Sequence, residues 1–268
     1  MMKKLFPNAK TIAAIALPVL LAVGYVSPAS GASSHESYRD NEKIRPGGSY
    51  NCKYTKTPIT IDGRLNDPAW EKANLLSLYI PVTDVEPISK TETRLMWDDN
   101  YLYVGFKAYD KDVWSHLTER DTQTCTEDVL EVFLQTNPAE EPYFNFEINA
   151  LGTIYDAYNL KRRAGGDDHH RWRRWNIEGI KTAIHVEGEI NNPDGIDKYW
   201  QMEVAIPFAE LATLKGKTPQ PGDKWHFQVS RYDYSIYLPN GVELTASTKL
   251  TRVDFHLVEE WQPLVFNK

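Results

Sequence analysis

Cysteine is scarce in this sequence of 268 residues, which contains only Cys52 and Cys125. Two cysteines cannot build a disulfide framework, and without a CxxC motif or a Cys/His cluster there is no indication of a zinc site. A single bond between these two cysteines remains open, because the sequence says nothing about the distance between them.

Positive charge is also in the minority. The chain has 30 Lys and Arg residues against 37 Asp and Glu residues, which gives a formal net charge of −7. Phosphate backbones and anionic lipid surfaces both attract basic proteins. We therefore expect neither a nucleic acid partner nor electrostatic attachment to a membrane.

The motifs of common enzyme classes are absent as well. The sequence has no G-x-S-x-G elbow, no HExxH and no Walker loop. Glu131 and Glu147 could form the carboxylate pair of a glycoside hydrolase. Glutamates on the polar face of a sheet are ordinary in so acidic a chain, so we expect no enzymatic activity.

An apolar stretch of 16 residues, 11–26, lies near the N-terminus behind three lysines and ahead of Ala29 and Ala32. A basic start, a short apolar core and small residues are the three parts of a secretory signal. The stretch is shorter than the roughly 20 residues of a membrane-spanning helix. Residues 1–32 are therefore predicted to be a signal peptide, and the mature protein to be secreted, periplasmic or on the cell surface, without a membrane span.

Residues 33–49 are polar and end in Pro-Gly-Gly, which is typical of a flexible N-terminal tether. No second linker follows, so residues 50–268 are interpreted as one domain. Apolar and polar residues alternate in that domain, and strands are expected at 93–97, 101–109, 129–135, 143–150, 181–189, 199–206 and 224–232. This pattern predicts an all-β fold, an antiparallel β-sandwich of jelly-roll type, with one or two short helices near residues 67–70 and 207–214.

The polar faces of three expected strands carry the candidate site. Glu131, Glu147, Asn149 and Gln228 fall opposite the apolar side chains, so we expect them to face solvent. Carboxylates and amides supply the acceptors and donors that sugar hydroxyls need.

Sugars also stack on aromatic rings, and the chain has 8 Trp and 15 Tyr from which such rings could come. Trp114, Trp172, Trp175 and Tyr232 lie at strand ends or in loops, where binding residues concentrate. Trp97, Trp200 and Trp225 are interpreted as core residues.

Metal binding has one further candidate in the run Asp167–His170. Six Lys and Arg residues flank the run and disfavour another cation, so it is interpreted as a solvated loop. A structural calcium elsewhere remains possible, although no EF-hand spacing marks its ligands.

Several motifs in order resemble carbohydrate-binding module family 9 and its relatives. They are Pro58–Trp70, Leu95–Val104, Glu127–Phe133, Phe144–Asn149, Tyr199–Pro207 and Phe255–Leu257. The resemblance implies a β-sandwich related to the DOMON superfamily that binds sugars, often binds calcium, and accompanies secreted glycoside hydrolases.

The same resemblance implies roles for particular residues. Glu131, Asn149 and Gln228 match polar site positions of the xylanase-attached members. Two clamp tryptophans of those members fall beside Cys125 and near Ser247, and an arginine is replaced by Glu147. Stacking rings would therefore come from elsewhere, and Trp114 and Trp175 are the candidates.

The expected function is an exported, non-catalytic carbohydrate-binding domain that recognises oligo- or polysaccharides, with a glycoside hydrolase as a possible partner. Neither the sugar nor its linkage follows from the sequence. The related superfamily supplies a second hypothesis, haem held by Met96 or Met202 and one of several histidines (His116, His169, His170, His185, His226), although no CxxCH is present. A surface scaffold without a ligand is the third.

Overall fold

The computed structural model describes residues 43–44, 47–162 and 175–268, within a compact unit that begins at Asp40. The predicted signal peptide and the Asp167–His170 run lie outside these residues. Lys43 and Ile44, which were assigned to the tether, pair in parallel with a strand at Leu75–Ser77.

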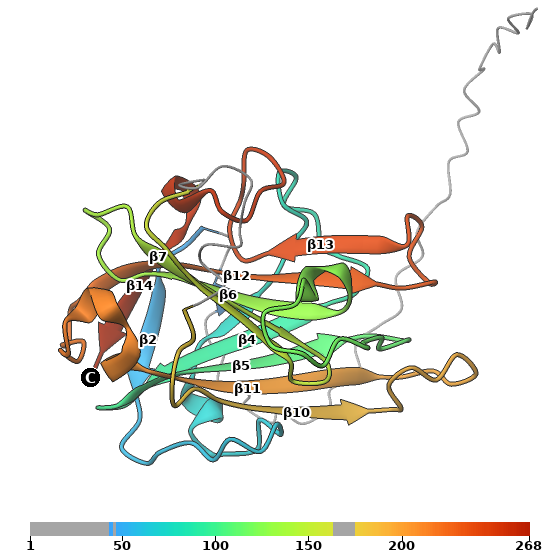
Figure 1. The fold of residues 1–268 in the computed structure, drawn as a ribbon, viewed down its shortest axis with the longest axis horizontal. Helices are drawn as coiled ribbons and strands as arrows, with labels where there is room; N and C mark the ends of the chain where they lie inside the picture. The colour runs from blue at the N-terminus through green and yellow to red at the C-terminus, as the bar shows by residue number, and fades with distance from the viewer. Residues whose placement is uncertain (1–42, 45–46, 163–174) are drawn as a thin grey trace, which may run out of the picture. The chain divides into compact units, whose positions relative to one another are not determined.

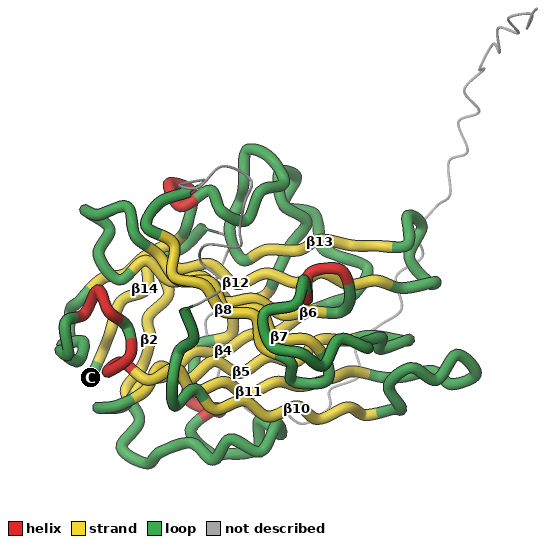
Figure 2. The backbone as a smooth tube through the Cα atoms, in the orientation of Figure 1, coloured by secondary structure: helices red, strands yellow, loops and turns green. Residues whose placement is uncertain are grey.

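Within residues 43–44, 47–162 and 175–268, nearly all regular structure is β-strand, and helix is confined to single 3₁₀ turns in the loops (Figure 2). The strands are β1 (Lys43–Ile44), β2 (Tyr50–Tyr54), β3 (Leu75–Ser77), β4 (Thr91–Trp97), β5 (Tyr101–Tyr109), β6 (Val129–Gln135), β7 (Tyr143–Asn149), β8 (Ile154–Asn159), β10 (Lys181–Glu187), β11 (Tyr199–Pro207), β12 (Lys224–Tyr234), β13 (Val242–Ala246) and β14 (Gln262–Asn267). The turns are η1 (Trp70–Lys72), η2 (Thr124–Thr126), η4 (Phe208–Glu210), η5 (Ala212–Leu214) and η6 (Val258–Glu260). The predicted all-β class is confirmed, and the expected short helices are single turns.

The strands form one curled sheet in the order β10-β11-β5-β4-β2-β14-β12-β6-β7-β8 (Figure 1). Most neighbours are antiparallel, as predicted, but β2 runs parallel to both β14 and β4. Alternation of side chains reports which face a residue occupies and not the direction of its neighbour. The parallel pairs could therefore not be read from the pattern.

The sheet curls at β2 and β14, so that its two ends face each other. We call β10, β11, β5 and β4 the β5 half, and β12, β6, β7 and β8 the β6 half. Val104 and Val204 of the β5 half belong to the same buried cluster as Val132, Phe146 and Val229 of the β6 half. The inner faces thus share one hydrophobic core, which is the packing of a β-sandwich.

The outer face of the β5 half is covered by the segment 59–73. Ile59 and Trp70 pack there on Met96, Tyr103 and Ala205. The turn at Gly63 has a φ of +85°, and a Cβ at this position would lie 2.7 Å from the backbone of Ile184. Only glycine fits so close an approach with a positive φ.

Part of the outer face of the β6 half is covered by the segment 250–261. Phe255, Leu257 and Trp261 of this segment pack on Phe133 of β6 and Tyr143 of β7. The rest of that face is hollow.

The two cysteines are not joined by a disulfide. Cys52 lies in the main core, whereas Cys125 lies in η2 on the outer side of the β6 half. Among the described residues, no helix has the length and apolar character to cross a membrane.

Candidate functional site

A row of four side chains crosses the outer face of the β6 half. Ser230 of β12 lies opposite Glu131 of β6, Glu131 lies opposite Glu147 of β7, and Glu147 lies opposite Tyr155 of β8. Directly opposed residues share one face of a sheet. The strand register therefore brings together two carboxylates, a hydroxyl and an aromatic ring that are distant in the sequence.

Glu131, Glu147 and Tyr155 of this row form the floor of a pocket of about 520 Å³, which we call the carboxylate pocket. Its volume lies within the roughly 300–1,000 Å³ of small-molecule sites. Side chains from β6, β7, β8 and β12 form the floor, and η2 and the segment 252–256 form the walls. The lining residues are Gln123, Cys125, Glu131, Phe133, Asn145, Glu147, Tyr155, Asn159, Tyr232, Arg252, Val253, Asp254, Phe255 and His256.

Both floor glutamates accept hydrogen bonds from short neutral donors. The Ser230 hydroxyl donates to Glu131, the Thr124 hydroxyl donates to Glu147 over 2.8 Å, and the Asn145 amide donates to Glu147 over 2.9 Å. Burial raises the pKa of Glu131 well above its usual range, and the neighbouring carboxylate of Glu147 raises it further. The pair therefore disfavours two negative charges at once.

The side-chain oxygen of Asn145 is a further hydrogen-bond acceptor at the floor of the pocket. The side-chain nitrogen of this residue is used by Glu147, but Oδ1 has no hydrogen-bond partner among the described residues. The residue is only 1% exposed and lines the pocket. A buried acceptor without a donor is costly, so a ligand hydroxyl or amine would satisfy this oxygen.

Aromatic rings flank the carboxylates on both sides. Tyr155 lies beside Glu147, and Tyr232 lines the pocket near Glu131 with its ring set against Phe255 at 5.4 Å between centroids. Burial and the nearby Glu131 carboxylate raise the pKa of Tyr232, so its hydroxyl stays protonated.

Of the lysines and arginines that the structure describes, Arg252 lines the rim of the pocket. Arg252 forms an ion pair of 3.0 Å with Asp254, and both line the pocket beside His256. His256 contacts the Tyr143 hydroxyl through Nδ1 at 2.8 Å. The rim is therefore polar, but its arginine already faces a carboxylate.

The expectation that the floor glutamates face solvent is wrong. Glu131 is 2% exposed and Glu147 is also buried, because η2 and the segment 250–261 cover the face that alternation assigns to water. Both side chains lie at the bottom of a hollow.

Asn149 and Gln228 are also buried, not solvent-facing, and neither lines the pocket. The Asn149 amide donates to the Leu117 carbonyl over 2.8 Å and to Glu127. The Gln228 amide donates to the Phe255 carbonyl over 3.1 Å. These two amides fix the loops around the pocket, which makes them positioning residues for its walls.

The two tryptophans expected to stack on a sugar lie away from the carboxylates. Trp175 packs against Phe144, Phe146 and Tyr158, with its ring 5.4 Å from that of Phe144. Phe144 and Phe146 point to the inner face of β7, whereas Glu147 points outward. Trp114 is 47% exposed and follows β5, outside the pocket lining.

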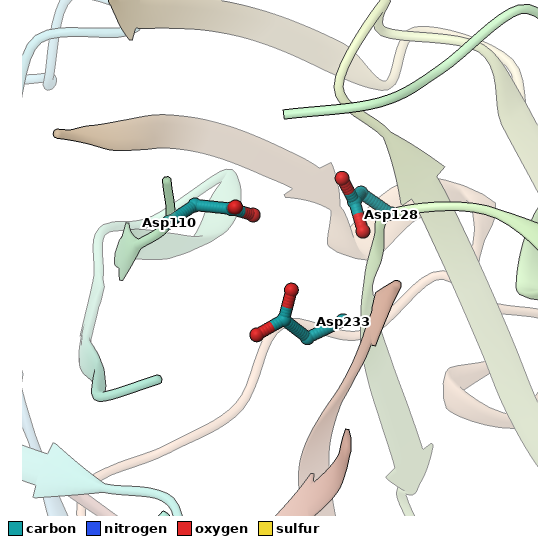
Figure 3. Close-up of side chains that lie close together, drawn as sticks. All are labelled: Asp110, Asp128 and Asp233. Atoms are coloured by element: carbon teal, nitrogen blue, oxygen red, sulfur yellow. The ribbon is translucent and has the colours of Figure 1, made fainter. Parts of the chain in front are cut away.

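A second acidic cluster lies where β5 ends, β6 begins and β12 ends. Asp110 follows β5, Asp128 precedes β6 and Asp233 belongs to β12, and Figure 3 shows their carboxylates pointing toward one another. An oxygen from each lies within 4.8 Å of the others, and all three residues are buried. Burial raises the pKa of Asp110 to about 6, although the Arg231 guanidinium opposes this shift.

The counterion of this cluster is Arg231. Its guanidinium is fully buried and lies 2.7 Å from Asp110 and 3.2 Å from Asp233, and it donates to the Tyr109 carbonyl over 2.9 Å. Asp128 instead accepts backbone N–H groups at 2.6 and 2.8 Å. Three carboxylates suit calcium in ligand type, but the guanidinium already faces two of them. The described contacts therefore fit a calcium ion only in part. Because Asp110 follows β5 and Arg231 belongs to β12, their ion pair connects the two halves of the sandwich.

The residues missed by sequence reasoning come mainly from outside the chosen strands. Asn145 lies on β7 two residues before Glu147, so alternation places it on the same face, and Tyr155 has no distinguishing motif. Arg252, Asp254 and His256 belong to an irregular segment whose position depends on packing at Trp261 and Phe255. Alternation carries no signal for such a segment.

Comparison with known proteins gives a consistent result. The sequence model of the carbohydrate family 9 binding domain-like family matches residues 61–245. The chain is 26% identical over 160 residues to exoglucanase XynX of Acetivibrio thermocellus. That alignment covers 60% of this chain but only 12% of the exoglucanase, so the chain spans a small part of that protein.

Two solved structures share the fold. A "putative carbohydrate-binding protein" from Bacteroides uniformis ATCC 8492 superposes with a TM-score of 0.66 at 13% identity, over 82% of this chain and 99% of that one. A family 9 carbohydrate-binding module from Caldicellulosiruptor kristjanssonii, in complex with cellotriose, gives a TM-score of 0.55 at 16% identity, over 82% and 93% of the two chains.

Proposed function

Because the chain belongs to the carbohydrate family 9 binding domain-like family, we propose that the carboxylate pocket binds a saccharide and performs no chemistry on it. The observation that carries this proposal is the row across β6, β7 and β8. It sets Tyr155 beside Glu147, and Glu147 beside Glu131, in a hollow of suitable volume. The carboxylates can accept hydrogen bonds from sugar hydroxyls, and the aromatic side chain can stack on the C–H face of a sugar ring.

The geometry of the carboxylates supports binding over hydrolysis. Glycosidases place two carboxyl groups on either flank of the scissile bond. Glu131 and Glu147 are nearest cross-strand neighbours on one sheet face, so both lie on the same side of any bound ligand. The domain is therefore a non-catalytic binding module.

The biological setting follows from two further observations. Residues 1–32 have the pattern of a secretory signal, and the chain matches a segment of an exoglucanase. We place the domain outside the cytoplasm, in polysaccharide utilisation, next to a glycoside hydrolase that supplies the chemistry.

The haem hypothesis receives no support from the described residues. Met96 lies on the outer face of the β5 half under the segment 59–73, whereas Met202 lies in the main core. Both are buried among apolar side chains, which is the ordinary position of methionine.

Isothermal titration calorimetry with a panel of oligosaccharides tests the proposal. Binding of one or more members is expected, and Tyr155→Ala should weaken it about tenfold, since a stacking ring contributes about 1–1.5 kcal/mol. Tyr237→Ala is the matched control, because Tyr237 is exposed outside the pocket. A protein that binds no saccharide, as a scaffold would, contradicts the proposal.

A further inference from the structure

A second row of side chains crosses the outer face of the β6 half, two residues along the strands from the carboxylates. Phe133 of β6 lies opposite Asn145 of β7, and Asn145 lies opposite Ala157 of β8. Asn159 comes two residues after Ala157 on β8, so it shares this face and is a diagonal neighbour of Asn145. Because Phe133, Asn145 and Asn159 all line the carboxylate pocket, one apolar ring and two amides meet in the same part of it.

The two amides leave atoms of opposite character without a partner. The Asn145 nitrogen donates to Glu147 over 2.9 Å, and this bond fixes which atom of the amide is the oxygen. That oxygen, an acceptor, and the side-chain nitrogen of Asn159, a donor, are both buried and have no hydrogen-bond partner among the described residues. Since a buried polar atom without a partner is costly, a matching ligand donates to Asn145 and accepts from Asn159.

A secondary amide group meets both requirements at once. It carries a donor and an acceptor, the N–H on one side of a planar group and the C=O on the other. A hydroxyl offers both roles from one oxygen, which suits two partners that converge on a single point. Diagonal neighbours in a sheet are roughly 7–8 Å apart, so the arrangement of Asn145 and Asn159 favours the extended amide over the single oxygen.

The pocket also has an apolar wall beside these amides. Phe133 lies directly opposite Asn145, and its ring is packed against that of Trp261 at 5.4 Å between centroids. Phe255 and Val253 line the same pocket. A methyl group that leaves water for such a surface gains hydrophobic free energy, which a hydroxyl in its place does not.

We infer that the carboxylate pocket selects N-acetylated saccharides, that is, sugars in which an acetamido group replaces a hydroxyl. This inference rests on the proposed function and narrows it to a ligand class. The amide N–H of the ligand donates to the Asn145 oxygen, its carbonyl accepts from the Asn159 nitrogen, and its methyl group packs on Phe133.

Three β-1,4-linked trimers separate this inference from general sugar binding. They are cellotriose, the trimer of glucosamine and the trimer of N-acetylglucosamine, each titrated calorimetrically. The acetylated trimer is expected to bind at least tenfold more tightly than either of the others, because only this trimer carries the amide and the methyl group. Since the acetamido group is uncharged, this affinity should change little as salt is added.

Variants of the two asparagines locate the effect. Asn159 is partly exposed at the end of β8, and Asn159→Ala should reduce the preference for the acetylated trimer to within about threefold. Asn267→Ala is the matched control, because Asn267 ends β14 outside the pocket lining. Thermal melts establish that each variant is folded, and Asn145→Ala, with the same expected loss of preference, replaces Asn159→Ala if the latter does not fold.

The possible outcomes lead to different conclusions. Equal affinity for cellotriose and the acetylated trimer overturns this inference and leaves the proposed function standing. A preference that persists in the folded asparagine variant also overturns it, because another part of the protein then recognises the acetamido group. If no saccharide binds, the inference and the proposed function are both wrong.

Discussion

The two outer faces of the sandwich each bury a carboxylate, and they treat it differently. On the β5 half, Glu203 accepts the backbone N–H groups of Asp62 and Gly63 and the indole N–H of Trp70, at 2.8–2.9 Å. On the β6 half, Glu131 lies against a second carboxylate, Glu147, and borders a cavity. The segment that covers the first face fills it, whereas the segment that covers the second leaves a pocket.

The two faces differ in the role of their buried carboxylates: one holds the fold together, and the other borders a candidate binding pocket. Three rigid N–H donors satisfy the Glu203 carboxylate within the fold, and this carboxylate in turn anchors the covering segment. In the Glu131–Glu147 pair, hydroxyl and amide groups donate to the carboxylates, and the two carboxylates are neighbours. Burial and the neighbouring carboxylate raise the pKa of Glu131, and a buried acidic residue with a raised pKa that borders a cavity is a candidate for a binding site.

Removal of the structural carboxylate should have the largest effect. Glu203→Ala leaves three donors on the segment 59–73 without an acceptor, of which the Gly63 N–H and the Trp70 indole N–H are buried, and each buried loss costs about 1–3 kcal/mol. We expect a decrease of about 3–5 kcal/mol in the free energy of unfolding, measured by urea denaturation. A decrease below about 1 kcal/mol would mean that the turn at Gly63 does not depend on this carboxylate.

Trp175 tests whether aromatic rings on the inner face contribute to binding. Trp175→Ala removes a half-buried ring from its contacts with Phe144 and Phe146, and we expect a loss of about 2–3 kcal/mol of stability. Saccharide affinity should stay within about twofold of the wild type. A tenfold loss of affinity in the folded variant would restore Trp175 as a stacking platform.

Neutralising Glu131 in the carboxylate pocket should stabilise the protein, whereas the substitutions of Glu203 and Trp175 destabilise it. Glu131→Gln keeps an acceptor for Ser230 and removes the repulsion from Glu147, so we expect a gain of about 0.5–1 kcal/mol at neutral pH. Glu203→Gln is the matched comparison on the other face and should destabilise the protein. The midpoints of urea denaturation measure the stability of both variants. If Glu131→Gln and Glu203→Gln are destabilised to a similar extent, the two carboxylates do not differ in their role.

The pH dependence of stability should give the smallest effect. The pKa of Glu131 is raised in the folded state, chiefly by burial and then by Glu147. The native state therefore holds this proton more tightly than the unfolded chain does. The stabilisation that this bound proton gives to the folded state is complete below the pKa of the unfolded chain, about 4.3, and is lost as the pH rises through the pKa of the folded state.

Accordingly, the stability of the wild type relative to Glu131→Gln should fall as the pH is raised from about 4 to 8. Urea denaturation at a series of pH values measures this difference. A difference that stays constant, or that favours the wild type at higher pH, contradicts the raised pKa.

Alternation in the sequence predicted the faces of the strands correctly. Phe144 and Phe146 point into the core, and Glu131 and Glu147 point outward, because successive side chains of a strand alternate. The same pattern could not reveal what covers the outer face. Phe255 and Trp261 approach from the end of the sequence, and their packing on Phe133 converts an expected solvent surface into a pocket wall.

The sequence could not show which aromatic residues lie beside the carboxylates. Trp114 and Trp175 were chosen because they lie at strand ends or in loops, but such a position does not specify which side of a sheet a ring reaches, and neither lines the carboxylate pocket. Tyr155 would have been found only from the register of β7 with β8, which depends on the turn between them. Asn149 and Gln228 were placed on the right side of the sheet, but their amides fix the loops around the pocket.

The parallel pairing of β2 with β14 has a consequence for the order in which the protein can fold. β2 is among the first strands to leave the ribosome and β14 is the last, yet they lie side by side, with Leu264 opposite Tyr50 and Phe266 opposite Cys52. Phe266 also packs against Trp97 and Trp225, which belong to different halves of the sandwich. A nascent chain that ends before β14 therefore has two separate sheet edges and an unsealed core. Closure therefore requires β14, so the domain should complete its fold only once this strand has been synthesised, at the slow rate typical of pairing between distant segments.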